Sequence, residues 1–262
     1  MNIDLTGKTA IVCGASKGIG RAAAMELAAL GATITVIARN AEMLEQVRAS
    51  LPTPKYQNHQ SLAVDFSDIN LVHIKIANFI KAGNKAHILL NNSGGPPAGP
   101  VHTATPEQFI AVFNQHLIGS HVMTQALLPV MKEEKYGRII NVVSTSVKQP
   151  IKGLGVSNTI RGAVASWAKT LAGEVGGWGI TVNNILPGAT DTDRMAEIVE
   201  GKSQKFGKPV ADIIAEEISH IPAGRFGSPE ELAQAIGFLA SPAAAYINGI
   251  NLPVDGGRTG CL

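Results

Sequence analysis

The chain has 262 residues, of which 45% are hydrophobic and 16% charged, a composition typical of a globular domain with a substantial core. Its formal net charge of +2 argues against a nucleic-acid partner bound through a strongly basic surface. No apolar run has the length of a membrane span and the N-terminus lacks a signal-peptide pattern, so we expect a cytoplasmic protein without membrane contact. Cys13 and Cys261 lie at opposite ends of the chain, and we expect neither a disulfide nor a metal site.

Short apolar segments bounded by Gly, Asn, Asp or Pro predict seven strands, at 9–13, 33–37, 61–64, 88–91, 138–143, 181–185 and 251–254. Longer amphipathic segments between them predict helices at 19–30, 41–51, 68–82, 105–132, 157–173 and 229–239. This alternation predicts a three-layer α/β fold, with a doubly wound parallel sheet and helices on both faces. With no linker, repeat or low-complexity segment in the sequence, we expect residues 1–262 to form one domain.

A glycine-rich turn follows the first predicted strand and opens the first helix. It reads Gly14-Ala15-Ser16-Lys17-Gly18-Ile19-Gly20. Glycine lets such a turn approach a pyrophosphate closely, and the free N–H groups of the helix start then face the anion. The pattern predicts a dinucleotide site made by Gly14, Ser16, Lys17, Gly18, Ile19 and Gly20, although such turns also occur for packing alone.

The Gly-x-x-x-Gly-x-Gly spacing resembles the short-chain dehydrogenase/reductase family, and other motifs extend the resemblance over nearly the whole chain. They are Asn91-Asn92-Ser93-Gly94, the segment 137–144, Pro187-Gly188 and Val254-Asp255-Gly256-Gly257. The resemblance, strongest to members of the 3-oxoacyl-carrier-protein reductase type, implies a Rossmann-type fold and a nicotinamide-dependent oxidoreductase. It also implies cofactor contacts at Asp65, Phe66, Asn91, Ser93, Gly94, Arg161, Pro187, Gly188, Thr190 and Thr192. Cys13 departs from the threonine that is usual in the family.

The end of the second strand bears on the choice of cofactor. An NAD enzyme usually has an acidic residue there to bind the ribose 2′-hydroxyl. This chain has Ala38 instead, followed by Arg39 and Asn40, and Lys17 lies in the glycine turn. Two cations suit a 2′-phosphate, so we expect NADP(H), unless both are merely solvated surface charges.

The catalytic positions implied by the resemblance are altered. The family uses a serine, a tyrosine and lysine spaced Tyr-x-x-x-Lys, and an asparagine on the preceding helix. Here the serine is Ser144, but Ser157 replaces the tyrosine, Arg161 the lysine and His116 the asparagine. A serine hydroxyl is shorter and less acidic than a phenol, so it is poorly suited to general acid catalysis. Arg161 keeps the positive charge that holds the nicotinamide ribose.

The source of the proton is therefore open. Imidazole titrates near neutrality, which makes His116 a candidate acid, although a helix histidine is more often packed or solvated. Lys148, four residues after Ser144, is a candidate to polarise a carbonyl or bind an acidic substrate, or it is an exposed loop lysine. We expect none of the three tyrosines, Tyr56, Tyr136 and Tyr246, to reach the site.

Three functional hypotheses remain. The first is an NADP(H)-dependent oxidoreductase that reduces a small-molecule ketone or 3-oxoacyl substrate with an altered proton donor. The second is a catalytically impaired NADP(H)-binding protein that acts as a sensor or scaffold. The third is imine or enoyl reduction on the same platform. The resemblance also implies a substrate lid at 194–220 and a homo-oligomer, a tetramer or dimer built through the helices at 105–132 and 157–173.

Overall fold

The computed structural model describes residues 1–261. Seven parallel strands form one sheet in the order β3-β2-β1-β4-β5-β6-β7. The strands are β1 (Thr9–Cys13), β2 (Thr33–Ala38), β3 (Gln60–Ala63), β4 (Ile88–Asn91), β5 (Gly137–Val142), β6 (Ile180–Pro187) and β7 (Asn251–Val254). The strand order reverses direction between β1 and β4, and a crevice forms at the carboxyl ends of the strands at such a point.

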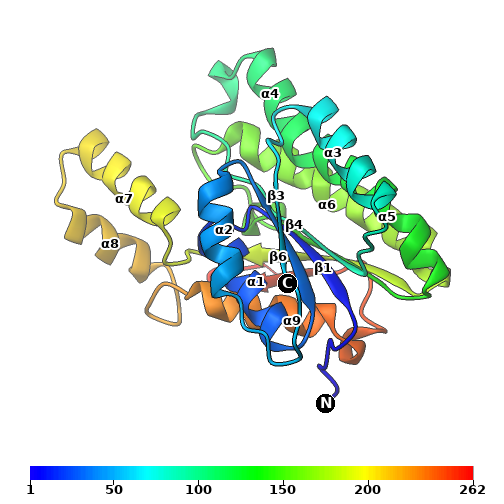
Figure 1. The fold of residues 1–262 in the computed structure, drawn as a ribbon. Coiled ribbons are helices and arrows are strands. Elements are labelled where there is room, and N and C mark those ends of the chain that lie inside the picture. The colour runs from blue at the N-terminus through cyan, green and yellow to red at the C-terminus, as the bar shows by residue number, and fades with distance from the viewer. Residues whose placement is uncertain (262) are drawn as a thin grey trace.

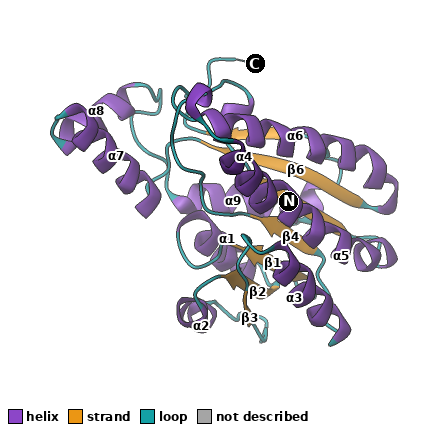
Figure 2. Ribbon diagram, turned by 90° about the horizontal axis from the view of Figure 1, so that it is seen from above, coloured by secondary structure: helices purple, strands orange, loops and turns teal. Residues whose placement is uncertain are grey.

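Helices cover both faces of the sheet, as Figures 1 and 2 show, so the predicted three-layer Rossmann-type fold is confirmed. One layer consists of α1 (Gly18–Ala29), α2 (Ala41–Ser50) and α9 (Pro229–Ala240), and the other of α3 (Ile69–Lys81), α4 (Pro106–Phe113), α5 (Gly119–Glu133) and α6 (Gly155–Val175). Each layer closes its own apolar core: alternate strand residues face either α1 and α9 or α3, α5 and α6. None of the helices in residues 1–261 is long and apolar enough to cross a membrane.

The segment predicted as one helix at 105–132 is more complex than its periodicity indicated. A π-helical turn at Asn114–Ile118 separates α4 from α5. The start of α4 is well defined, because Thr105 and Gln108 form a capping box at its N-terminus. The extra residue in the turn rotates the following helix relative to the first, and π turns of this kind often lie at functional sites. Hydrophobic periodicity does not distinguish a π turn from an α turn, so the π turn could not be predicted from the pattern of apolar residues.

Two helices extend from the body of the molecule at its left in Figure 1. They are α7 (Asp193–Phe206) and α8 (Val210–Ser219), joined through Gly207, whose φ of +63° is the left-handed conformation that ends many helices. Glu217 on α8 joins this pair to the rest of the chain. Its carboxylate contacts Lys202 on α7 and lies 3.2 Å from the guanidinium of Arg258 in the C-terminal segment.

A row of side-chain amides crosses four strands of the sheet. Asn91, Asn141, Asn184 and Asn251 are register partners on β4, β5, β6 and β7. Each Nδ2 donates to the Oδ1 of the next residue, at 2.9, 2.8 and 2.8 Å in that order. We call these four residues the asparagine ladder. It joins β4, β5, β6 and β7, the four strands on one side of β1, by side-chain hydrogen bonds in addition to the backbone ones.

Candidate active site

The glycine turn between β1 and α1 is as tight as the sequence indicated. Gly14 and Gly18 have φ angles of +61° and +55°, which side-chain-bearing residues rarely adopt. A Cβ on Gly20 would lie 2.1 Å from the carbonyl oxygen of Gly14. The amide of Asn92, which follows β4, donates to that same carbonyl at 3.3 Å. The turn is therefore packed against the end of β4, and only glycine fits at Gly20.

The N-terminus of α1 is open to an anion. Lys17 is its N-cap residue and makes no side-chain capping hydrogen bond, whereas Asn40 caps α2 and Asp68 caps α3. Uncapped N–H groups at a helix start, together with the positive end of the helix dipole, favour a phosphate. The pyrophosphate site that the sequence predicts at this turn stays a prediction. Among the described residues, no group of three or more His, Cys, Asp or Glu side chains is arranged to hold a metal ion.

The ends of β2 and β3 bring together the predicted adenosine contacts. The backbone N–H of Ser67 and the nearby charge of Arg39 lower the pKa of Asp65 below its ordinary value. Arg39 itself is exposed at the end of β2. Asn40 instead uses its side chain to accept the Met43 N–H at 2.9 Å, so the structure gives it a capping role in α2. The ring of Phe66 packs beside Gly119 at the start of α5.

The end of β5 presents Ser144. The N–H of Ser146 donates to its Oγ at 3.1 Å, so the hydroxyl hydrogen of Ser144 is free to be donated elsewhere. Helix α6 packs against the turn at 145–147 and against β6. Ser157 and Arg161 lie one turn apart on this helix, and both are buried. The structure therefore gathers these three residues around the end of β5.

The side chain of Arg161 is held at the carboxyl end of β5. Its Nη1 donates to the carbonyl of Val142 at 2.8 Å, while its Nε is buried with no hydrogen-bond partner among the described residues. Burial lowers the pKa of Arg161 to about 10, so the side chain still carries a positive charge at neutral pH. A buried cation with an unused donor can stabilise negative charge that develops nearby.

His116 lies in the π turn with 3% of its surface exposed. Its Nδ1 is 2.7 Å from the Oγ of Ser93, and its Nε2 is buried without a partner in the described chain. Burial and the charge of Arg161 lower the pKa of His116 to about 3. The ring is therefore neutral at physiological pH. This pKa differs from the near-neutral value expected from the sequence, because the fold desolvates the imidazole beside a cation.

The tyrosines lie elsewhere, as expected. Tyr56 and Tyr246 are fully exposed on the surface. Tyr136 precedes the amino end of β5, at the opposite end of the strand from Ser144, and its hydroxyl donates to the carbonyl of Ala240 at 2.7 Å. Lys148 is half-buried on the loop after Ser144. Its carbonyl oxygen lies 3.7 Å from the Sγ of Cys261, so the C-terminal segment reaches this loop.

The loop after β6 passes next to the glycine turn. A Cβ on Gly188 would lie 2.6 Å from Cα of Asp255, so Pro187-Gly188 packs directly on the segment after β7. Thr190 is buried and its hydroxyl donates to the Gly188 carbonyl. Thr192 caps α7, and its Cγ2 would lie 3.4 Å from a Cβ on Gly18. The predicted contacts Thr192 and Gly18 are thus neighbours.

The site also contains features that the sequence reading missed. Asn92 belongs to the Asn91-Asn92-Ser93-Gly94 motif, but the sequence did not predict that its side chain holds the glycine turn. Ser146 is buried, its backbone supports Ser144, and its own Oγ has no partner in the described chain. Asp193 lies 3.3 Å from the ammonium of Lys17. The motif spacing could have pointed to Asn92, whereas the other two contacts depend on tertiary structure.

Gly94, a predicted cofactor contact, is exposed, with open space around it.

Comparisons with known proteins agree with this architecture. A family model described as Enoyl-(Acyl carrier protein) reductase matches residues 14–259. The chain is 32% identical to 3-oxoacyl-[acyl-carrier-protein] reductase FabG of Pseudomonas aeruginosa, covering 97% of this chain and 98% of that protein. It is 30% identical to the NADPH-dependent reductase BacG of Bacillus subtilis, with the same coverage. L-sorbose reductase of Gluconobacter frateurii, solved with NADPH and L-sorbose, matches with a TM-score of 0.93 at 30% identity, over 100% of both chains.

Proposed function

Because the chain belongs to the short-chain dehydrogenase/reductase family, we propose that it is an NADP(H)-dependent oxidoreductase acting on a carbonyl compound of ketone or 3-oxoacyl type. One observation carries the proposal: the uncapped N-terminus of α1, after β1, and the buried cation Arg161, beside the end of β5, lie at the carboxyl ends of strands in the same parallel sheet. The first fits a dinucleotide pyrophosphate. The second supplies positive charge where a carbonyl oxygen would become negative.

The preference for NADP(H) rests on three positions. Ala38 ends β2 where a carboxylate would bind a ribose 2′-hydroxyl, and Arg39 follows it. Lys17 lies in the glycine turn, with its side chain 55% exposed. Both cations are therefore accessible to a 2′-phosphate, which favours charged hydrogen-bond donors. The relatives named for NADPH support this choice. Bound NADPH would supply the hydride.

The chain's own residues would bind and polarise the substrate. Ser144 donates its free hydroxyl hydrogen to the substrate oxygen, because its Oγ already accepts from the Ser146 N–H. Arg161 keeps its charge next to this position and stabilises the oxyanion. Ser157 puts a short hydroxyl where the family has a phenol. Neither His116 nor a tyrosine supplies the proton, so in ketone reduction the alkoxide would take it from water or from Lys148.

The shortage of an acid favours a second candidate, reduction of a C=C bond conjugated to a carbonyl. Hydride addition at the β-carbon produces an enolate, whose oxygen needs the hydrogen bond of Ser144 and the charge of Arg161. The proton is then added at carbon and can come from solvent. The low pKa of His116, about 3, and the location of all three tyrosines away from Ser144 support this candidate. The description of the matching family model as an enoyl reductase also supports it.

Isotope labelling distinguishes the candidates. NADPH labelled with deuterium at the transferred position is incubated with a ketone, a 3-oxoacyl thioester, an imine and an α,β-unsaturated ketone. Deuterium at the carbinol carbon supports carbonyl reduction, and deuterium at the β-carbon supports the second candidate. Ser144→Ala should lower either activity. Tight NADPH binding without turnover of any compound would overturn both and favour a cofactor-binding sensor or scaffold.

We also propose that α7 and α8 form a substrate lid and that the chain is a homo-oligomer. The helix pair projects from the body of the molecule in Figure 1, and Thr192, which precedes α7, lies next to Gly18 of the glycine turn. On α4, Ile110 and Phe113 are 60% and 37% exposed, which leaves an apolar surface that a second copy could bury. Light scattering that reports a monomer would contradict the assembly.

A further inference from the structure

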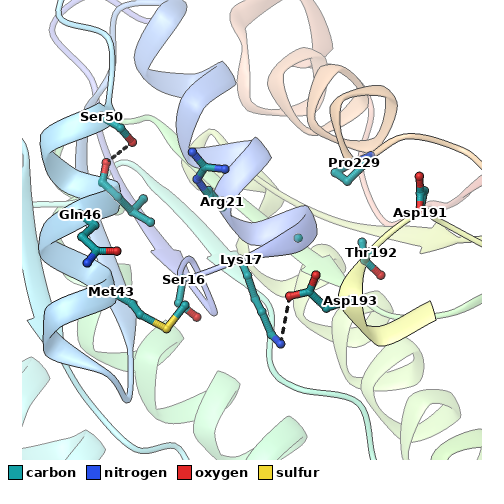
Figure 3. A pocket seen from close by; sticks show the side chains of 12 residues that line it. Ser16, Lys17, Arg21, Met43, Gln46, Ser50, Asp191, Thr192, Asp193 and Pro229 are labelled. Atoms are coloured by element: carbon teal, nitrogen blue, oxygen red, sulfur yellow. Dashed lines mark hydrogen bonds and ion pairs between the residues drawn. The ribbon is translucent and has the colours of Figure 1, made fainter. Parts of the chain in front are cut away.

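An ion pair joins the cofactor turn to the base of the lid. The ammonium of Lys17 lies 3.3 Å from the carboxylate of Asp193, the first residue of α7. The pair borders a cavity of about 430 Å³ between α1, α2 and the loop that leads into α7. Figure 3 shows the Lys17 side chain pointing to Asp193 across this space, with Met43 and Gln46 of α2 on the other side. Lys17 therefore has room to move away from its partner.

We propose that Asp193 is a cofactor-specificity residue that competes with the 2′-phosphate of NADP(H) for Lys17. The inference rests on the NADP(H) preference proposed above. Asp193 and the phosphate are both anions, and one ammonium can approach only one of them closely. When the phosphate takes Lys17, Asp193 loses its partner and the first turn of α7 loses a contact with the body. NAD(H) has no 2′-phosphate and leaves the pair intact.

Because the Lys17–Asp193 ion pair is exposed to solvent, it is weak enough for a 2′-phosphate to displace Asp193 from Lys17. Lys17 and Asp193 have side chains that are 55% and 70% exposed, and exposed ion pairs contribute little to stability. A dianionic phosphate is a stronger partner for an ammonium than one carboxylate. The ion pair therefore lowers the affinity for NADP(H) slightly without preventing binding. The contact between the first turn of α7 and the glycine turn is therefore kept when NAD(H) binds and lost when NADP(H) binds.

A matched control is present in the same cavity. Asp191 also borders it, and Asp191→Asn removes the same charge as Asp193→Asn. The ion pair recorded for Lys17 in the described chain is with Asp193 alone. A general electrostatic effect would act in both variants, whereas competition for Lys17 would act only in Asp193→Asn.

The test measures dissociation constants of NADP⁺ and NAD⁺ by calorimetry at low salt. We expect Asp193→Asn to tighten NADP⁺ binding by about two- to fivefold, the range that exposed pairs allow. NAD⁺ affinity should not change, and Asp191→Asn should have the smaller effect. In a Lys17→Met background the effect of Asp193→Asn should disappear. Equal effects of the two aspartate variants, or an effect that survives in Lys17→Met, would overturn the inference.

Hydrogen exchange tests the coupling to the lid. NADP⁺ should raise amide exchange in the first turn of α7 relative to NAD⁺ at equal saturation, and this difference should be absent in Asp193→Asn. No difference in the wild-type protein would overturn the coupling. A wild-type protein that binds NADP⁺ no better than NAD⁺ would instead overturn the proposed cofactor preference, so the two failures are distinguishable.

Discussion

The Oγ of Ser93 lies 2.7 Å from Nδ1 of His116, which joins the end of β4 to the π turn between α4 and α5. The contact orients an imidazole whose other nitrogen is buried and unpartnered in the described chain. His116 stands where the resemblance led us to expect asparagine. The altered position is therefore held by a direct side-chain contact with the segment after β4.

The burial of His116 predicts a pH dependence of stability. Its pKa is lowered from 6.5 to about 3 in the folded protein, so between these values the unfolded chain binds a proton that the folded chain does not. Stability is unaffected above pH 6.5 and falls as the pH decreases, by at most about 1.4 kcal/mol per pH unit. Urea unfolding from pH 7 to 4.5 should show a shallower loss in His116→Asn than in the wild type. His73→Asn, at an exposed position on α3, is the control, and equal slopes in all three proteins would contradict the prediction.

Restoring the phenol should restore ketone chemistry. In Ser157→Tyr with Arg161→Lys, the tyrosine hydroxyl would act as a general acid with its pKa lowered by the lysine. General acid catalysis contributes about 10²- to 10⁴-fold, so we expect a gain in kcat/KM for ketone reduction of at least about 10²-fold. Steady-state NADPH oxidation measures this gain. Arg161→Lys alone is the control and should show little gain. No gain in the double variant would mean that the missing phenol is not what limits ketone reduction.

Reversing the charge at Arg39 should change the cofactor preference. Arg39→Asp removes a donor to the 2′-phosphate and places a carboxylate near the ribose 2′-hydroxyl. Hydrogen bonds to charged groups contribute about 1.5–3 kcal/mol, so the ratio of the NADP⁺ and NAD⁺ dissociation constants should shift by about 10- to 100-fold toward NAD⁺. Fluorescence titration gives both constants. Lys55→Asp, an equal charge change at an exposed loop position, should leave the ratio unchanged.

Alanine at two glycines should have opposite effects. A Cβ on Gly20 would lie 2.1 Å from a backbone oxygen, so Gly20→Ala should destabilise the protein by about 3 kcal/mol and weaken dinucleotide binding. A Cβ on Gly162 in α6 meets nothing within 4 Å. Gly162→Ala should therefore stabilise the protein by about 0.5–1 kcal/mol, since alanine is the better helix former. Thermal unfolding compares the two, and a stable Gly20→Ala variant with normal binding would show that the turn can open.

Local patterns accounted for most of the fold. The strands at 9–13, 88–91 and 251–254 were predicted with their observed bounds, because short apolar runs ended by turn residues leave little choice. The bounds of α6 were less accurate, since Gly155 starts the helix without a capping side chain. The segment at 194–220, which the resemblance implied as a lid, corresponds closely to α7 and α8, and the helix-breaking residues Gly207 and Pro209 lie between them.

The sequence predicted where the candidate site residues lie in the fold, but not which of them contact one another. Motif spacing placed Ser144, Ser157 and Arg161 at one end of the sheet, where the structure has them. It could not give the neutrality of His116, because that depends on burial and on a cation 45 residues further along the chain. The pairing of Lys17 with Asp193 was equally inaccessible, since 176 residues separate them and tertiary structure alone brings them together.

The asparagine ladder has a consequence for strand alignment. Its amides share a face of the sheet with Leu89, Ile139 and Val182, two residues earlier on β4, β5 and β6. A slip of one residue in any of these strands would turn its amide to the apolar side under α1 and α9 and leave the amides it bonds in the ladder without that partner. Backbone hydrogen bonds alone would tolerate that slip. The ladder therefore favours the observed register of these four strands. Because Ser144 follows β5, its alignment with the ends of β4 and β6 depends in part on side chains that take no part in the chemistry.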